Sequence, residues 1–146
     1  MDITVTVESV LNPTEDEAKV ERALHNIFPR EKVQKANLGA DVVVLRMLGS
    51  GLEFLSTLRS LIKQERIRSA ARSILFKGTT GQRIQVYLNK QAAFMGRPSF
   101  CEPTGESPNG PISIQIESTD PQAVIDYLAS IPGEGFSRYA VERRRR

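Results

Sequence analysis

A run of basic residues between positions 59 and 77 offers the clearest chemistry in this sequence. The run carries six cations against one acid, Glu65, whereas a solvated helix usually places acids four residues from its bases. Guanidinium and ammonium groups bind phosphate oxygens, and a surface of one charge sign attracts a polyanion, most often a nucleic acid. We therefore predict that six side chains of this run contact phosphates: Arg59, Lys63, Arg66, Arg68, Arg72 and Lys77.

The Gly-Thr-Thr-Gly motif at 78–81 has the spacing of the loop with which KH domains clamp a nucleic-acid backbone. In KH domains this loop joins two helices, whereas the residues after Gly81 alternate as in a strand. A plain turn is therefore the favoured interpretation. Lys77 and Arg83 flank the turn, and both are predicted to meet phosphate.

The segment 87–100 mixes cations with aromatic residues. Base stacking needs exposed aromatic faces beside cations, and this mixture can supply them. Large aromatic side chains carry much of the buried area of a protein, so Phe94 and Phe100 are expected in the core. Lys90 and Arg97 are the cations of this segment that we predict to extend the phosphate-binding surface.

The residues Gly-Ser-Gly at 49–51 stand between a predicted strand and a predicted helix. A helix N-terminus offers free backbone N–H groups, so this arrangement resembles a phosphate-binding turn. The third glycine of a dinucleotide fingerprint is absent, because Phe54 occupies its place. A turn with Ser50 as the helix cap explains the same residues and is favoured, and a nucleotide-binding accessory to an enzyme remains the less favoured alternative.

The sequence offers no convincing catalytic or metal-binding constellation. His25 is the only histidine and Cys101 the only cysteine, so neither a multi-histidine metal site nor an intramolecular disulfide is possible. No Ser/His/Asp order and no Walker loop can be assembled. We predict a non-enzymatic protein that uses neither a metal nor a cofactor.

Length and composition predict one soluble domain, 1–132, followed by a flexible basic tail, 133–146. The run 59–77 contributes +5 and the stretch 138–146 contributes +4 to a net charge of +3, so the rest of the chain is acidic. The longest strongly apolar run, 42–45, is far shorter than the ~20 residues that span a bilayer. With no secretory signal and a lone cysteine, the sequence predicts a cytoplasmic protein with no membrane contact.

Hydrophobic periodicity predicts an α+β fold. Two similar strand–helix units bracket the domain, and in the first of them Asn12 and Pro13 are predicted to begin the helix. The predicted strands are 3–9, 32–37, 41–48, 82–88, 97–102 and 112–118, and the predicted helices are 13–28, 52–64, 67–77, 89–94 and 121–131. We expect two layers, with a mostly antiparallel sheet of about five or six strands and helices packed on one face.

Three runs of the sequence resemble an uncharacterised archaeal protein family described as RNA-binding. They are NPTEDEAKVERALHNIFP, IRSAARSILFKGTTGQRIQVYLNKQAAFMGRPSF and SPNGPISIQIESTDPQAVIDYLA. The likeness extends from Ile3 to about Pro132 and leaves out the arginine tail. It implies a fold similar to the ribosomal large-subunit protein that binds five-S RNA, and it supplies no catalytic residue and no defined ligand.

Charge and resemblance together favour a non-enzymatic RNA-binding protein that contacts phosphates through a basic helical surface. The second hypothesis is a protein-interaction module or homodimer that uses an exposed sheet edge or helix face. In that case the basic surface would meet an acidic partner.

Overall fold

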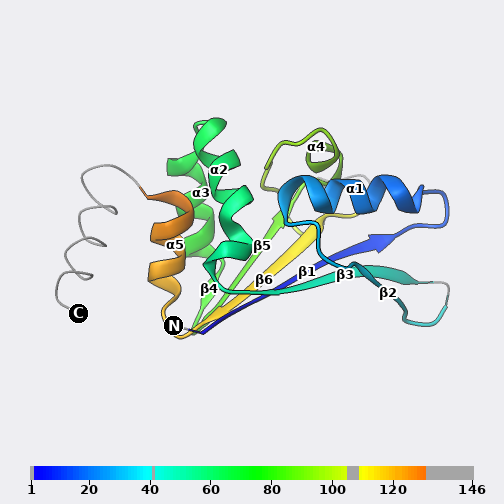
Figure 1. The fold of residues 1–146 in the computed structure, drawn as a ribbon, viewed down its shortest axis with the longest axis horizontal. Helices are drawn as coiled ribbons and strands as arrows, with labels where there is room; N and C mark the ends of the chain where they lie inside the picture. The colour runs from blue at the N-terminus through cyan, green and yellow to red at the C-terminus, as the bar shows by residue number, and fades with distance from the viewer. Residues whose placement is uncertain (1, 41, 105–108, 131–146) are drawn as a thin grey trace.

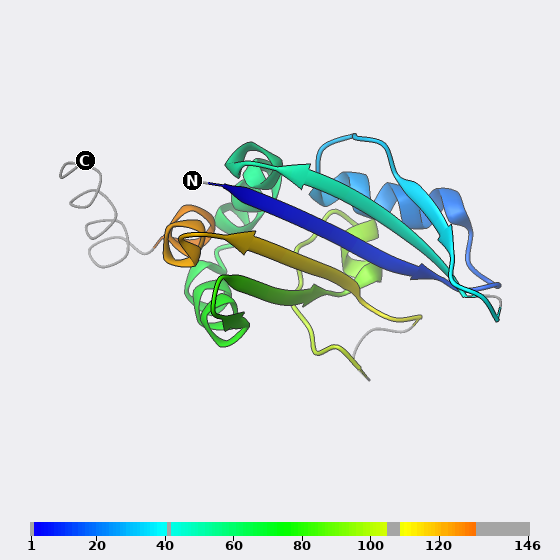
Figure 2. The same ribbon diagram turned by 90° about the horizontal axis from the view of Figure 1, so that it is seen from below.

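An antiparallel sheet forms one layer of the molecule, and the helices lie on one of its faces (Figures 1 and 2). The structure is a computed structural model that describes residues 2–40, 42–104 and 109–130. Across those residues the sheet has six strands in the order β2-β3-β1-β6-β5-β4, and neighbouring strands are antiparallel. The strands are β1 Ile3–Leu11, β2 Gln34–Asn37, β3 Val43–Ser50, β4 Thr79–Thr80, β5 Arg83–Leu88 and β6 Ile112–Ser118.

The helical layer divides into two groups over opposite ends of the sheet (Figure 1). α1 packs beside α4 over one end, and α2 and α3 pack with α5 over the other. The helices are α1 Glu17–Ile27, η1 Leu52–Leu55, which is a 3-10 helix, α2 Ser56–Gln64, α3 Arg68–Lys77, α4 Lys90–Phe94 and α5 Pro121–Ala129. This two-layer arrangement confirms the predicted α+β fold class.

The alternation of β1 explains how the two layers hold together. Ile3, Val5 and Val7 point toward the helices and are buried, while the residues between them face away. Ile114 and Ile116 of β6 lie opposite Val7 and Val5, so the apolar rows continue across the sheet. Burial of each such side chain contributes about 1.5–3 kcal/mol, which makes these central strands the base on which the helices are positioned.

The first helix begins later than the sequence pattern predicts. Asp16 caps α1 by accepting a hydrogen bond from the backbone N–H of Ala18, so the helix starts at Glu17. Asn12 instead donates from both its backbone N–H and its side-chain Nδ2 to the Glu15 carboxylate. The predicted start at Asn12 and Pro13 is therefore wrong, because Asn12 holds a loop that orients Glu15.

The predicted strand 97–102 is also wrong. This segment runs beside the end of β5, where Asn89 donates to the carbonyl of Ser99 and Cys101 donates to the carbonyl of Tyr87. Only Phe100 forms a β-bridge, with Leu88. Pro98 has no backbone N–H to donate, which limits any longer ladder here.

The Gly-Thr-Thr-Gly motif forms a tight hairpin between β4 and β5, as the favoured interpretation predicts. Thr80 pairs with Arg83, and Gly81 adopts a φ of 60°, the left-handed conformation that glycine reaches at no steric cost. Gly78 lies against the carbonyl of Gln85, and a side chain there would collide with that oxygen. Both glycines therefore have structural reasons to be where they are.

The predicted basic tail, 133–146, and the predicted domain end at 132 lie outside the described residues. Within the described part, no helix is both long enough and apolar enough to cross a bilayer.

Candidate nucleic-acid interface

The basic run 59–77 forms the hairpin of α2 and α3. Leu58 and Ile62 anchor α2 in the core, and Ala71 and Leu75 anchor α3. The two helices are separated by a short turn in which Arg66 has a φ of 57° and the N–H of Ile67 bonds to the carbonyl of Ile62. The predicted break near Gln64 is confirmed, and it places cations at the tip of a helical hairpin.

Three cations gather around this turn, and we call Lys63, Arg66 and Arg68 the basic tip. Lys63 and Arg66 are exposed, and Arg68 is half-buried. Among the described residues none of the three forms an ion pair. None of them pairs with Glu65, the acid of the same turn, or with another described carboxylate, so the three cations outnumber the acid and attract an anionic partner.

Two further cations of the run are exposed at the ends of the hairpin. Arg59 of α2 donates from Nε to the carbonyl of Tyr127 at 2.9 Å, and its guanidinium lies 4.8 Å from the centroid of the Tyr127 ring. These contacts hold the guanidinium in place beside α5, and its terminal nitrogens form no hydrogen bond with the described residues. Lys77, in the last turn of α3, is exposed and forms no ion pair within the described chain.

Arg72 does not face solvent, and this part of the prediction is wrong. Its side chain is about one-tenth exposed and forms an ion pair of 2.7 Å with Asp126 of α5. It also donates to the carbonyl of Ala129 and lies 5.2 Å from the centroid of the Phe76 ring. Arg72 joins α3 to α5, so its guanidinium is directed at buried partners rather than at a phosphate on the surface.

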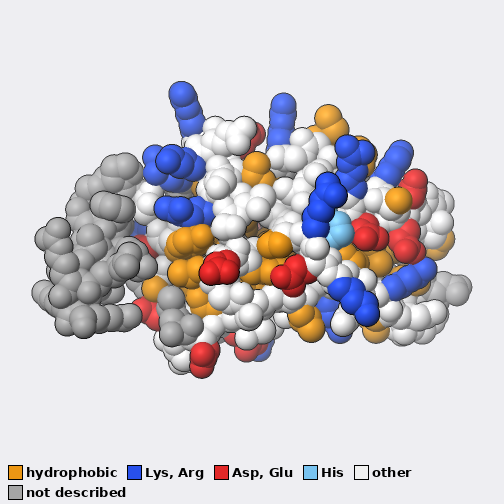
Figure 3. Space-filling model, viewed as in Figure 1, with side chains coloured by type: hydrophobic (Ala, Val, Ile, Leu, Met, Phe, Trp, Pro, Cys, Tyr) orange, Lys and Arg blue, Asp and Glu red, His pale blue; other side chains and the backbone are white. Residues whose placement is uncertain are grey.

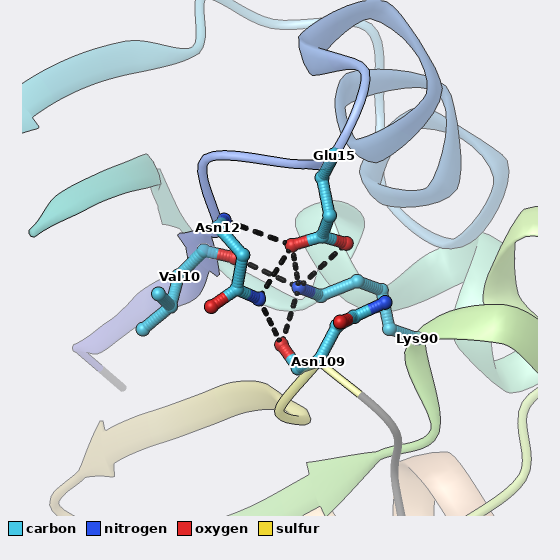
Figure 4. A network of polar contacts seen from close by, with 5 residues as sticks. All are labelled: Val10, Asn12, Glu15, Lys90 and Asn109. Atoms are coloured by element: carbon cyan, nitrogen blue, oxygen red, sulfur yellow. Dashed lines mark hydrogen bonds and ion pairs between the residues drawn. The ribbon is translucent and has the colours of Figure 1, made fainter.

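Lys90 is also buried rather than exposed, with 4% of the residue accessible. Figure 4 shows its ammonium at the centre of a polar network. Nζ donates to the carbonyls of Val10 at 2.7 Å and Asn109 at 2.9 Å, and it lies 3.0 Å from Oε1 of Glu15. Because Lys90 connects the end of β1, the loop before α1 and the segment before β6, it is a structural residue.

The network keeps the Glu15 carboxyl ionised. Burial alone would raise the pKa of Glu15, but the backbone hydrogen bond from Asn12 opposes it. The side-chain hydrogen bonds from Lys90 and Asn12 and the Lys90 charge act in the same direction. Together they outweigh burial and hold the pKa of Glu15 below its ordinary value.

Arg83 and Arg97 lie apart from the hairpin. Arg83 points to the face of the sheet opposite the described helices, which we call the uncovered face. There it forms an exposed ion pair of 3.1 Å with Glu117 of β6. Arg97 follows α4 and is exposed, and it forms no ion pair among the residues described. Of the nine predicted contacts, the structure groups five on and beside the α2–α3 hairpin: Arg59, Lys63, Arg66, Arg68 and Lys77.

The sequence prediction missed a second set of cations on the same side of the molecule. Figure 3 shows Lys and Arg side chains over α1 as well as over α2 and α3. Lys19 and Arg22 of α1 are exposed, and the Arg22 guanidinium lies 5.7 Å from the centroid of the Phe94 ring in α4. Glu17 and Glu21 alternate with these cations in the sequence. The stretch therefore shows no run of one charge sign from which a basic surface could be predicted.

The uncovered face of the sheet is close to electrically neutral. Glu8 pairs with Arg46 at 2.7 Å across β1 and β3, and Glu117 pairs with Arg83. Between these pairs lie mainly uncharged side chains, among them Thr4, Thr6 and Gln115. A polyanion therefore finds more uncompensated positive charge on the helical side than on this face.

The Gly-Ser-Gly turn does not have the geometry of a phosphate site. The Phe54 ring lies directly over Gly49, where a side chain would collide with it. Gly51 precedes the 3-10 helix η1, which is only four residues long, and no side chain caps that helix. The expectation that Ser50 caps a helix is wrong, and the glycine at 49 is explained by packing.

Substitution of Gly49 by alanine tests this explanation. The new methyl group would force the buried Phe54 ring to move, so we expect the free energy of unfolding to fall by about 1–3 kcal/mol. Urea denaturation measures the change. Gly51→Ala, at a φ of 78° but with open space around it, separates backbone strain from collision. Equal stability of wild type and Gly49→Ala would show that Phe54 does not constrain this position.

Within the described residues no group of three His, Cys, Asp or Glu side chains could hold a metal ion.

Comparison with known proteins places this structure in a family. A family model described as RNA binding matches residues 4–118. A UPF0201 protein of Aeropyrum pernix is 40% identical over 143 residues, which are 97% of this chain and 93% of the relative. A UPF0201 protein of Sulfolobus acidocaldarius is 38% identical over 131 residues, 90% of each chain.

A solved structure agrees with these sequence matches. The crystal structure of a UPF0201 protein from Methanococcus jannaschii superposes with a TM-score of 0.77 at 29% identity, and the match covers 90% of this chain and 96% of the other. The family model covers both the basic hairpin and the central strands. The chain therefore belongs to the family of archaeal UPF0201 proteins, and it also matches the family model described as RNA binding.

Proposed function

We propose that this protein is a non-enzymatic RNA-binding protein of the archaeal cytoplasm and that the α2–α3 hairpin contacts the phosphates. The observation that carries the proposal is the basic tip, where Lys63, Arg66 and Arg68 lie together and form no ion pair with a described carboxylate. Arg59 and Lys77 extend this surface along the two helices. The family description supports RNA as the polyanion, and the likeness to the ribosomal protein that binds five-S RNA remains part of this proposal.

Neutralising the basic tip tests the proposal. The variant Lys63→Gln, Arg66→Asn, Arg68→Gln removes three positive charges, and asparagine tolerates the left-handed conformation at position 66. With about 1 kcal/mol lost per phosphate contact, we expect affinity for a fluorescent random-sequence single-stranded RNA to fall about 100-fold. The slope of log K against log salt should become shallower by about 2. Fluorescence anisotropy over a salt series measures both.

A control variant makes the same change in net charge on the opposite face. Gln34→Glu, Leu48→Glu, Ser50→Glu adds three negative charges at exposed positions of β2 and β3. We expect this control to keep most of the RNA affinity, because the added carboxylates lie across the sheet from the helices. Equal losses in the two variants would show that net charge alone governs binding and would remove the hairpin from the proposal.

The uncovered sheet face favours a second candidate function, a protein interaction or homodimer. Leu48 is 53% exposed there, and the charged residues of the face are already paired with each other. Such a surface can meet another neutral surface without leaving charges uncompensated. Sedimentation at several protein concentrations tests it: a dimer of the wild type that dissociates in the Gln34→Glu, Leu48→Glu, Ser50→Glu control would support this function.

A further inference from the structure

A pocket of about 390 Å³ lies between α1 and α4, outside the hairpin described above. Its volume falls within the range of about 300–1,000 Å³ that is usual for small-molecule sites. Val20 and Ala23 of α1 line one side, and Phe94 and Met95 line the other. The walls are therefore largely apolar, and Met95 is 73% exposed, a large apolar side chain open to a ligand.

Cations lie next to these apolar walls. Lys19 lines the pocket, and the Arg22 guanidinium lies over the Phe94 ring. Both side chains belong to exposed residues of α1, and neither forms an ion pair among the described residues. Aromatic and apolar surfaces beside free cations are the combination with which proteins hold unpaired bases and their phosphates.

The polar end of the pocket is formed by the Lys90 network. Glu15 and Asn109 line it together with Gln91. Oε1 of Glu15 accepts hydrogen bonds from Asn12 and Lys90, whereas Lys90, at 3.2 Å, is the one donor among the described residues to Oε2. Oε2 therefore retains capacity for one more donor.

We propose that the α1–α4 pocket receives an unpaired nucleobase of the bound RNA. The base lies against Phe94 and Met95, an exocyclic amino group donates to Oε2 of Glu15, and the adjoining phosphate contacts Lys19 and Arg22. The inference rests on the proposed function, because the base comes from the RNA that this function assigns to the protein. It assigns the pocket to bases that carry an amino group, adenine, cytosine and guanine, in preference to uracil.

The charges of the pocket distinguish a base from other occupants. A free phosphate or a carboxylate inside the pocket would approach the ionised Glu15 and be repelled. A nucleotide avoids this repulsion, because its neutral base enters while its phosphate stays beside the cations of α1. A carboxylate that accepts from the amino group of a base is a known mode of base recognition.

Titration with nucleoside monophosphates tests the inference without a variant. Amide NMR spectra of the full chain are recorded with AMP, CMP, GMP and UMP up to millimolar concentration. We expect shifts at residues 19–23 and 91–96 for the first three, with UMP about 10-fold weaker. No shifts in these two segments, or equal binding of all four nucleotides, would overturn the inference.

A surface variant tests the same site in the RNA complex. Gln91→Glu, Met95→Glu places two negative charges on exposed residues that line the pocket. We expect single-stranded RNA affinity to fall about 10-fold while affinity for a blunt RNA duplex, which offers no unpaired base, is less affected. Gln34→Glu, Leu48→Glu is the control with the same charge change. Equal losses for both RNAs would overturn the base assignment.

The two proposals fail in different ways. Retained RNA affinity in the Lys63→Gln, Arg66→Asn, Arg68→Gln variant contradicts the proposed function but leaves the nucleotide titration unaffected. Loss of affinity in that variant together with an unperturbed pocket in the titration overturns only the base site.

Discussion

Replacement of Arg72 by methionine is expected to lower the free energy of unfolding by about 3–5 kcal/mol, because it leaves the carboxylate of Asp126 buried without its cation. The Asp126 side chain is only 1% exposed, and Gln122 remains as its hydrogen-bond donor. Methionine keeps most of the side-chain volume, so the loss reports the charge rather than a cavity. Urea denaturation of wild type and variant gives the difference.

A double variant separates the ion pair from packing. Arg72→Met combined with Asp126→Leu removes both charges, and we expect it to recover most of the lost stability. RNA affinity of the folded Arg72→Met protein should stay close to wild type, because the guanidinium does not reach the surface. If Arg72→Met kept the wild-type stability but lost RNA affinity, Arg72 would have to be counted among the phosphate contacts.

Replacement of Lys90 by methionine is expected to lower the free energy of unfolding by a similar amount, about 3–5 kcal/mol. The ammonium donates to the carbonyls of Val10 and Asn109 and to the Glu15 carboxylate, so its loss removes a buried donor from three acceptors at once. Asn12 still donates to Glu15 and to the Asn109 carbonyl, but no described cation then faces the buried carboxylate. Chemical denaturation measures the loss. Lys35→Met, which breaks an exposed ion pair with Glu17, is the matched control and should cost less than about 1 kcal/mol.

The pH dependence of stability checks the same network through Glu15. Its pKa is lowered in the folded protein, so its stabilising contribution is fully present above the unfolded pKa of about 4.3. That contribution is lost as the pH falls through the lower folded pKa. The stability advantage of wild type over Glu15→Gln should therefore narrow below about pH 4. A stability difference between wild type and Glu15→Gln that stays constant from neutral to acidic pH would contradict the conclusion that Glu15 is ionised.

Most of the fold follows from local patterns in the sequence. Period-two alternation located β1, β5 and β6, and proline with aspartate located the start of α5 at Pro121. The errors arose where one local pattern is compatible with two structures. Asn12 resembles a helix cap, but it bonds Glu15 in a preceding loop, and the segment around Pro98 lacks the donors that a strand requires.

The candidate site was predicted less completely, because charge in a sequence does not reveal which cations are paired. Arg72 and Arg68 belong to the same helix and look alike, yet only Arg72 meets Asp126, on an element far along the chain. The partner of Lys90, Glu15, is 75 positions away. On α1 the opposite error occurred, because the nearby glutamates concealed the exposed Lys19 and Arg22.

The division of the helices into two groups predicts that the two ends of the helical layer unfold separately. Each group has its own buried ion pair, Lys90 with Glu15 in one and Arg72 with Asp126 in the other. A group of helices that is stabilised by its own buried ion pair can unfold locally while the rest of the molecule stays native. In hydrogen exchange, α1 with α4 and α3 with α5 should therefore behave as separate foldons above a common, more slowly exchanging sheet.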